Sequence, residues 1–316
     1  MEVYKMYFPY LRGRQFELIA LRELLEENRI NEKIIPIIEP VTPSATLLKT
    51  IRTFVENDRE IAVVFNPTVG DFEEKLREMR GENSRVAADL DELLNSNNCV
   101  IKSYIMNSHA VRELKRKNDK DKYCIINMER DSIDDFLETY DNGIPRFTLI
   151  PDDRVFKRII PNTKVLFEDN FKKKSRNIDY IDKPDEFFSD SHLFYMNENF
   201  IGFADYSVVG EEYNESGFAP VAVAIHIVYF DEMKQLRIHH FVSDSNEGIE
   251  DPGGKFGEAL EKLVYWCDEE NVQQTLGLQG FYDCYNTGKY PGLGTVKKYS
   301  IMHHLELISN YLGGML

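Results

Sequence analysis

The sequence predicts an α/β protein whose core is a (β/α)8 TIM-like barrel, with a β-hairpin inserted after strand eight and a C-terminal helical extension. The main observation is that eight short apolar runs alternate with segments of helical periodicity over about the first two hundred residues, which is the repeat of a parallel barrel. An open doubly wound sheet would alternate in the same way and remains the alternative. It is disfavoured because no Gly-rich phosphate loop follows any of the runs.

Each expected barrel strand is a short apolar run. The eight runs are residues 6–11, 34–41, 61–66, 100–106, 123–129, 146–150, 164–167 and 200–206. In the second run, Pro36 and Pro40 disfavour an unbroken ladder of hydrogen bonds. Between the runs, apolar residues recur at helical spacing. These expected helices are residues 15–28, 42–58, 71–94 with a break near Gly81, 108–117, 132–140, 153–160 and 184–194.

The longest apolar run, residues 221–230, is broken only by His226. It is too apolar for a strand with one solvated face, so we expect it to be covered on both faces and to pair with residues 236–243 as a hairpin. The last barrel helix is expected at residues 257–270. The predicted domains are therefore a barrel domain, residues 1–272 including the inserted hairpin 218–244, and a helical extension, residues 273–316, packed on the barrel.

The charge balance limits the choice of partner. Thirty-eight Lys and Arg against 54 Asp and Glu give a net charge of −16, which opposes contact with phosphate backbones or anionic lipid. We therefore expect neither direct duplex nucleic-acid binding nor membrane binding. The basic stretches at residues 112–122 and 172–176 are interpreted as solvated charged faces.

The cysteines and the N-terminus indicate the compartment. The four cysteines are scattered without a metal-ligand spacing, and the N-terminus lacks the apolar core of a signal peptide. No apolar run reaches the ~20 residues that a membrane helix needs. These features predict a cytoplasmic protein with reduced thiols.

Acidic and amide side chains stand at or just after the ends of the expected strands. They are Glu39, Asn66, Glu129, Asp152 with Asp153, Glu168 with Asp169, and Asp205. In a barrel these ends converge on one face. Crowded carboxylates there would shift one another's pKa or recruit a divalent cation. Helix capping is the simpler explanation for Asp152, Asp153 and Glu168.

The catalytic candidates follow from this convergence. They are Asp205, Glu39, Glu129 and Glu168, with Arg12 or Arg14, just after the first strand, to neutralise an anionic substrate or to pair a carboxylate. If Glu39, Glu129 and Asp205 meet, their oxygen ligands would prefer magnesium, manganese or calcium over structural zinc.

Three histidines lie in the expected hairpin. His226 lies inside a wholly apolar strand, where a satisfied core imidazole is the commoner case. His239 and His240 are adjacent on a strand and therefore face opposite sides, with His240 on the buried face.

The Gly-rich turn at residues 290–295 lacks the Gly-Lys-Ser/Thr ending of a phosphate loop. We interpret it as a loop that leads into a helix.

Three segments carry a family resemblance. They are YFPYLRGRQFE from Tyr7, PIIEP from Pro36 and IGFADY from Ile201, and together they resemble the pattern of the phage beta-protein family and its bacterial relatives. The resemblance extends over most of the chain and implies a barrel-like protein of bacteria or their phages. Some relatives are similar to proteins of mobile-element or defence gene neighbourhoods, which implies a protein partner. The family motifs carry no settled catalytic role.

Two hypotheses on function follow. The first is a hydrolase or lyase, assisted by a divalent cation such as magnesium or manganese, with its acidic site at the barrel mouth. The second is a non-catalytic scaffold that docks a partner protein through the hairpin and the C-terminal extension. Clustering of the named acids in one cavity would favour the first, and exposed apolar surface on the extension would favour the second.

Overall fold

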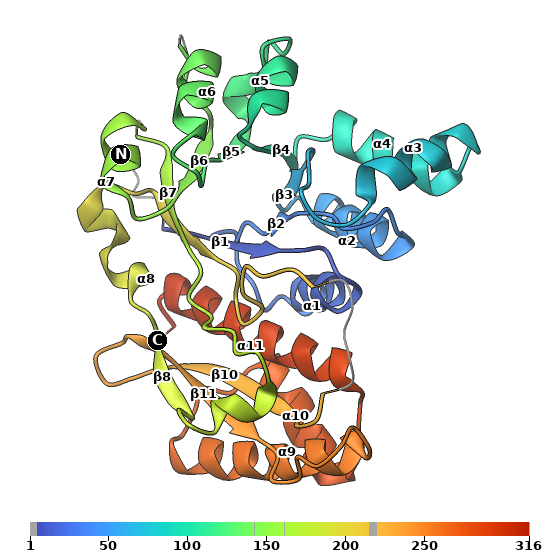
Figure 1. The fold of residues 1–316 in the computed structure, drawn as a ribbon, viewed down its shortest axis with the longest axis vertical. Helices are drawn as coiled ribbons and strands as arrows, with labels where there is room; N and C mark the ends of the chain where they lie inside the picture. Colours follow the sequence, from blue (N-terminus) through green and yellow to red (C-terminus); the bar gives the residue numbers. More distant parts are fainter. Residues whose placement is uncertain (1–4, 142, 161, 215–219, 316) are drawn as a thin grey trace. The chain divides into compact units, whose positions relative to one another are not determined.

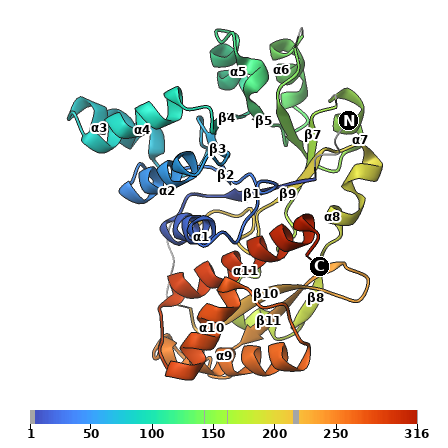
Figure 2. The ribbon, with the colours of Figure 1, turned by 180° about the vertical axis from the view of Figure 1, so that it is seen from behind.

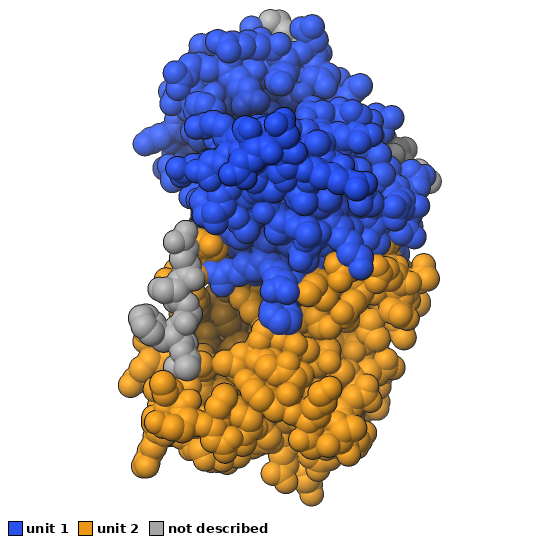
Figure 3. Space-filling view, turned by 90° about the vertical axis from the view of Figure 1, so that its right-hand side faces the viewer, with its two compact units in different colours: residues 1–18, 31–168, 191–206 blue, residues 19–30, 169–190, 207–316 orange. Residues whose placement is uncertain are grey.

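The computed structural model describes residues 5–141, 143–160, 162–214 and 220–315. The chain divides into two compact units, which Figure 3 colours blue and orange. Unit 1 comprises residues 1–18, 31–168 and 191–206, and unit 2 comprises residues 19–30, 169–190 and 207–316. Within the described ranges, no helix is both long and apolar enough to cross a membrane.

Unit 1 is a closed eight-stranded barrel, and all of its neighbouring strands pair in parallel. In order around the barrel the strands are β1 (Met6–Leu11), β2 (Ile37–Ile38), β3 (Ile61–Val64), β4 (Val100–Ile105), β5 (Cys124–Ile126), β6 (Phe147–Ile150), β7 (Lys164–Glu168) and β9 (Gly202–Asp205). The barrel closes where Tyr7 pairs with Phe203 and Pro9 with Asp205. The predicted TIM-like barrel is thereby confirmed.

Helices alternate with these strands and lie outside them (Figure 1). They are α1 (Gln15–Glu26), which runs from unit 1 into unit 2, α2 (Ala45–Glu56), α3 (Phe72–Gly81), α4 (Arg85–Ser96), α5 (Ser108–Leu114), η1 (Lys120–Lys122), α6 (Ser132–Thr139), α7 (Arg154–Ile159), α8 (Ser191–Phe194) and η3 (Tyr195–Glu198). Local sequence sets their starts. The Ser44 side chain accepts a hydrogen bond from the Leu47 amide at 3.1 Å, and Asp153 caps α7 in the same way, as predicted.

Alternate residues of each strand fill the barrel interior. A single buried cluster contains Phe8 and Tyr10 of β1 and the alternating residues of the other strands, ending with Ala204 and Tyr206. Because successive strand residues face opposite sides, residues of the other parity, such as Tyr7 and Asp205, point away from the interior. This alternation decides where each predicted site residue lies.

Unit 2 is built on a three-stranded antiparallel sheet in the order β10-β11-β8, alongside three long helices (Figure 2). Its elements are η2 (Asn177–Tyr180), β8 (Asp185–Ser189), β10 (Ala224–Phe230), β11 (Leu236–Val242), α9 (Pro252–Glu269), α10 (Leu276–Thr287) and α11 (Leu293–Gly313). Ile225, Ile227 and Phe241 of the predicted hairpin share one apolar core with residues of α9, α10 and α11. The hairpin and the C-terminal helices therefore form one compact unit, a different division from the expected 1–272 and 273–316.

The expected helix at residues 184–194 is wrong over most of its length. Residues Asp185–Ser189 form a strand that pairs with β11, and only Ser191–Phe194 is helical. The physical reason is a period of two: Glu186 and Phe188 are buried, whereas Phe187 between them is 40% exposed. A strand that adds to the hairpin was not anticipated. It brings Glu186 opposite Ile238 of β11.

Candidate functional site

The structure brings two predicted site residues together at the carboxyl end of the barrel. Arg12 forms a buried ion pair with Glu39, which is 0% exposed. The Tyr10 hydroxyl donates to Glu39 Oε2 at 2.8 Å. The Thr68 amide and hydroxyl donate to Oε1 at 2.7 and 2.9 Å. With four donors on two oxygens, the lone pairs of Glu39 are committed to structure.

The Arg12 guanidinium is held as firmly as its partner. Its central carbon lies 5.3 Å from the ring centre of Tyr10 and 5.1 Å from that of Tyr206, within the range of cation–π contact. Burial opposes the charged form, but the Glu39 carboxylate outweighs it and raises the pKa of Arg12. The Arg12 side chain is therefore charged, and its contact with Glu39 braces the end of the barrel.

Asp205 and Glu168 lie on the other side of the barrel wall. They are register partners on β9 and β7, and Asp205 lies between Ala204 and Tyr206 of the interior cluster, so its side chain points outward. It is 2% exposed and accepts a hydrogen bond from Tyr7 Oη at 2.6 Å. Ser191 Oγ donates to Glu168 at 2.6 Å. Asp205 is therefore buried on the outer side of the barrel wall and does not join an acidic site at the barrel mouth, because strand alternation turns it away.

Glu129 and Arg14 do not join either group. Glu129 is exposed, and its carbonyl accepts from the Ser132 amide at 3.0 Å in the turn before α6. Arg14 is half-buried, and its backbone amide donates to Glu17 at 3.3 Å. Among the described residues, no group of three or more His, Cys, Asp or Glu could hold a metal ion. The structure therefore does not assemble Glu39, Glu129 and Asp205 as metal ligands.

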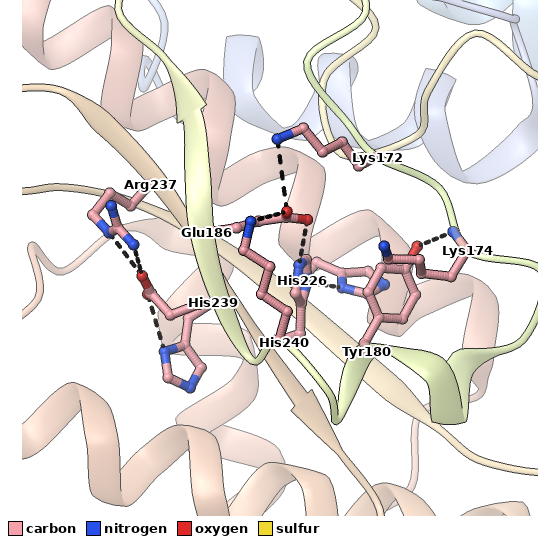
Figure 4. Close-up of polar contacts among 10 residues, drawn as sticks. Lys172, Lys174, Tyr180, Glu186, His226, Arg237, His239 and His240 are labelled. Atoms are coloured by element: carbon pink, nitrogen blue, oxygen red, sulfur yellow. Dashed lines mark hydrogen bonds and ion pairs between the residues drawn. The ribbon is translucent and has the colours of Figure 1, made fainter.

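A different chain of polar residues runs across the sheet of unit 2. His226 of β10 and His240 of β11 are opposite each other in the ladder, and their Nδ1 atoms are 2.7 Å apart. His240 Nε2 lies 3.5 Å from Glu186 Oε1 on β8. Figure 4 shows the three side chains in line, with Lys172 beyond the carboxylate. We call Glu186, His240 and His226 the relay.

His240 Nε2 makes no hydrogen bond with the described residues, but the Glu186 carboxylate 3.5 Å away favours one tautomer of the relay. A lone pair on His240 Nε2 would repel the Glu186 carboxylate, so this nitrogen carries the proton and His240 Nδ1 accepts. His226 Nδ1 must then be the donor across the 2.7 Å contact. His226 Nε2 is left with a lone pair, and it makes no hydrogen bond within the described part of the chain. The relay therefore ends in a free proton acceptor.

Protonation states in the relay have clear causes. Burial, together with His240 and Lys297, lowers the pKa of His226 well below its ordinary value. Burial also lowers the pKa of His240, to about 4, although the Glu186 carboxylate opposes the shift. Burial would raise the pKa of Glu186, but Lys183 at 3.1 Å and Lys172 at 3.7 Å lower it. At neutral pH the relay thus consists of two neutral imidazoles and one carboxylate.

His226 opens onto a cavity of about 250 Å³ within unit 2. The polar residues of its wall are Lys173, Lys174, Asn177, Tyr180, His226, Lys297 and Ser300. Phe171 supplies an aromatic face, with its ring centre 5.1 Å from that of His226. The Tyr180 ring centre is 4.7 Å from that of His226. A ligand in this cavity would meet an imidazole, ammonium groups and aromatic rings together.

The opposite face of β11 carries a separate, structural group. Asp185 pairs with Arg237, accepts from Tyr229 Oη at 2.8 Å and lies 3.4 Å from His239 Nδ1. The sequence had predicted that His239 and His240 face opposite sides, with His240 buried, and the structure confirms both points. Only His240 belongs to the relay.

Sequence reasoning missed the relay, although two signals for it were present. The expected strands 221–230 and 236–243 leave residues 231–235 as the loop, so pairing Phe230 with Leu236 places His226 opposite His240. The basic run at residues 172–176 is exposed, as expected of a solvated face, and it also supplies Lys173 and Lys174 to the cavity wall. Glu186 could not be foreseen, since its segment was expected to be helical.

The fold is that of an α/β protein with a TIM-like barrel, joined to an α+β unit that holds the relay. No protein-family model, curated protein or solved structure matches the chain. The resemblance to the phage beta-protein family therefore stays a prediction.

Proposed function

We propose that this protein is an enzyme of the hydrolase or lyase class and that His226 transfers the proton in its reaction. The observation that supports this most directly is the relay, which ends at a cavity with the unprotonated Nε2 of His226. A carboxylate that orients an imidazole, which in turn presents a base, is the arrangement of general acid–base catalysis.

The relay explains how His226 could act in both directions. His226 Nε2 would accept a proton from a water molecule or from a substrate carbon or oxygen, forming an imidazolium. The resulting charge would be stabilised through His240 by Glu186, without transfer of the second proton. Return of the proton from Nε2 to a leaving group would complete either a hydrolysis or an elimination. Such positioned proton transfer contributes about 10²–10⁴-fold in rate.

The earlier alternatives have less support. Glu39 and Asp205 are buried and bonded as braces, so an acidic site at the barrel mouth lacks free carboxylates. A docking role for the C-terminal helices would need apolar surface, but most of α11 is buried and its Val296 contributes to the unit 2 core.

Nitrogen NMR tests the proposal without a known substrate. Long-range ¹H–¹⁵N spectra of the histidine rings should show His226 protonated on Nδ1 and His240 protonated on Nε2 at pH 7. Diethyl pyrocarbonate, which modifies accessible unprotonated imidazoles, should label His226. A proton on His226 Nε2 would overturn the assignment of this residue as the base.

A matched pair of variants extends the test to activity. His226→Gln removes the base, whereas His239→Gln changes a histidine on the opposite face of the same sheet. In a panel of chromogenic esters and phosphate esters, turnover by the wild-type protein should fall about 10²-fold or more in His226→Gln and should persist in His239→Gln. Equal loss in both variants, with both folded by circular dichroism, would count against a catalytic role.

A further inference from the structure

We infer that the substrate held beside His226 is a small organic anion, a carboxylate or a phosphate ester, with an apolar body. The inference rests on the proposed function for the place where the substrate binds. The charge, size and lining of the cavity define the chemical class of this molecule.

The charge of the wall is the first argument. Three lysines line the cavity, and the described residues that form its wall include no Asp or Glu, although the whole chain has a net charge of −16. Lys173 is partly neutralised, since its ammonium lies 3.4 Å from the Glu212 carboxylate. The Lys174 ammonium makes no ion pair with any described residue. A local cationic wall on an acidic protein selects anions.

Lys297 places part of this charge next to the base. Its ammonium is close enough to His226 to contribute to the lowered pKa of that imidazole, and it projects from α11 into the cavity wall. Lys297 and His226 line the same cavity, so a carboxylate or phosphate bound beside this lysine would share the cavity with the imidazole. Recognition and proton transfer would then act on one molecule.

Size and lining define the rest of the ligand. A cavity of about 150 Å³ with apolar walls accommodates a benzene ring, so 250 Å³ has room for one ring or a short branched chain with its anionic group. Phe171 and Val296 supply apolar contact, and Asn177 and Ser300 supply polar contact. An inorganic anion alone would leave the apolar part of the wall unused.

Titration of the full-length protein with defined probes tests the inference. Benzoate and phenyl phosphate should bind and shift the His226 ring nitrogens, whereas neutral benzamide should bind at least about tenfold more weakly, a difference of about 1.4 kcal/mol. The relative affinities of the two anions distinguish a carboxylate from a phosphate substrate. Absence of binding by both anions at roughly 10 mM, or equal binding of benzamide, would overturn the inference.

Variants locate the site. Lys174→Gln combined with Lys297→Gln should weaken benzoate binding about tenfold or more, whereas Lys49→Gln, which changes an exposed lysine of α2 outside the cavity wall, should leave it unchanged. His226→Gln should still bind benzoate. If it binds while the wild-type protein carries its proton on His226 Nε2, the catalytic proposal fails and the anion site stands. If none of the lysine variants changes the affinity for benzoate, the proposed anion site is wrong, and the catalytic proposal is then judged by its own tests.

Discussion

Replacing Glu39 by Gln removes one negative charge from the buried pair at the carboxyl end of the barrel. The Gln oxygen can still accept from Thr68, but the new amide group takes the place of Oε2 and faces Arg12, which has only hydrogen-bond donors. The guanidinium is then buried without its counter-charge. Removing one partner of a buried ion pair costs about 3–5 kcal/mol, so we expect Glu39→Gln to lower the free energy of unfolding by that amount.

Urea unfolding followed by far-UV circular dichroism measures this loss. The single tryptophan, Trp266, lies in unit 2, so its fluorescence does not report directly on the barrel. Glu129→Gln is the matched control, because Glu129 is exposed and a surface change of this kind stays within about 0.5 kcal/mol. The double variant Arg12→Met with Glu39→Gln should cost less than the sum of the two single changes, since the stranded charge is gone.

The outcome separates a brace from a catalytic group. A loss of less than about 1 kcal/mol in Glu39→Gln, well below the cost of stranding a buried charge, would refute the reasoning. Glu39 would then return as a candidate for chemistry at the barrel mouth. Additive costs in the double variant would show that Arg12 and Glu39 stabilise the barrel independently.

Three further predictions follow from the same contacts. Asp205→Asn weakens the hydrogen bond from Tyr7 and should cost about 1–3 kcal/mol in urea unfolding, whereas an unchanged midpoint would mean that the carboxylate is no brace. Burial lowers the pKa of His240 and of His303 to about 4, below the ordinary 6.5, so the unfolded chain binds protons first as the pH falls. The stability that these two buried histidines provide is fully present above pH 6.5, and it declines towards pH 4 by at most about 1.4 kcal/mol per pH unit for each histidine. The variant His303→Gln should reduce this slope in unfolding curves measured at pH 7, 6 and 5. Duplex DNA should show no saturable binding in fluorescence anisotropy at moderate salt, because the net charge is −16, and a sub-micromolar isotherm with steep salt dependence would contradict this.

The barrel could be predicted because its signals are local and repeated. Each strand is an apolar run whose partner follows one helix later, so alternation alone gives the order of the strands. Pro36 and Pro40 flank the short β2, as the sequence suggested. The strand Asp185–Ser189 was missed because it pairs with β11, about fifty residues further on, and nothing nearby in the sequence marks that partner.

The candidate site was harder to predict from the sequence than the barrel was, for a related reason. The strand ends converge, as expected. Neighbouring residues of a strand face opposite sides, however, so a shift of one position turns a side chain from the interior to the outer wall. Asp205 lies on the outer side for this reason, whereas Glu39 continues the inner row after Ile35 and Ile37. Which acids meet a base or a lysine depends on register, and register is set by tertiary packing.

The filled end of the barrel explains why the chemistry proposed here belongs to unit 2. TIM-barrel enzymes place their active sites at the carboxyl ends of the strands, but here three aromatic rings occupy the interior near that end. The ring centres of Tyr10 and Phe167 are 5.2 Å apart, those of Tyr10 and Tyr206 are 5.2 Å apart, and those of Phe167 and Tyr206 are 4.7 Å apart. Arg12 stacks on two of these rings and pairs with Glu39. Opening a binding site among them would separate a buried ion pair and break aromatic contacts, each worth about 0.5–1.5 kcal/mol beyond burial. The relay needs no such rearrangement, because His226 already opens onto a cavity.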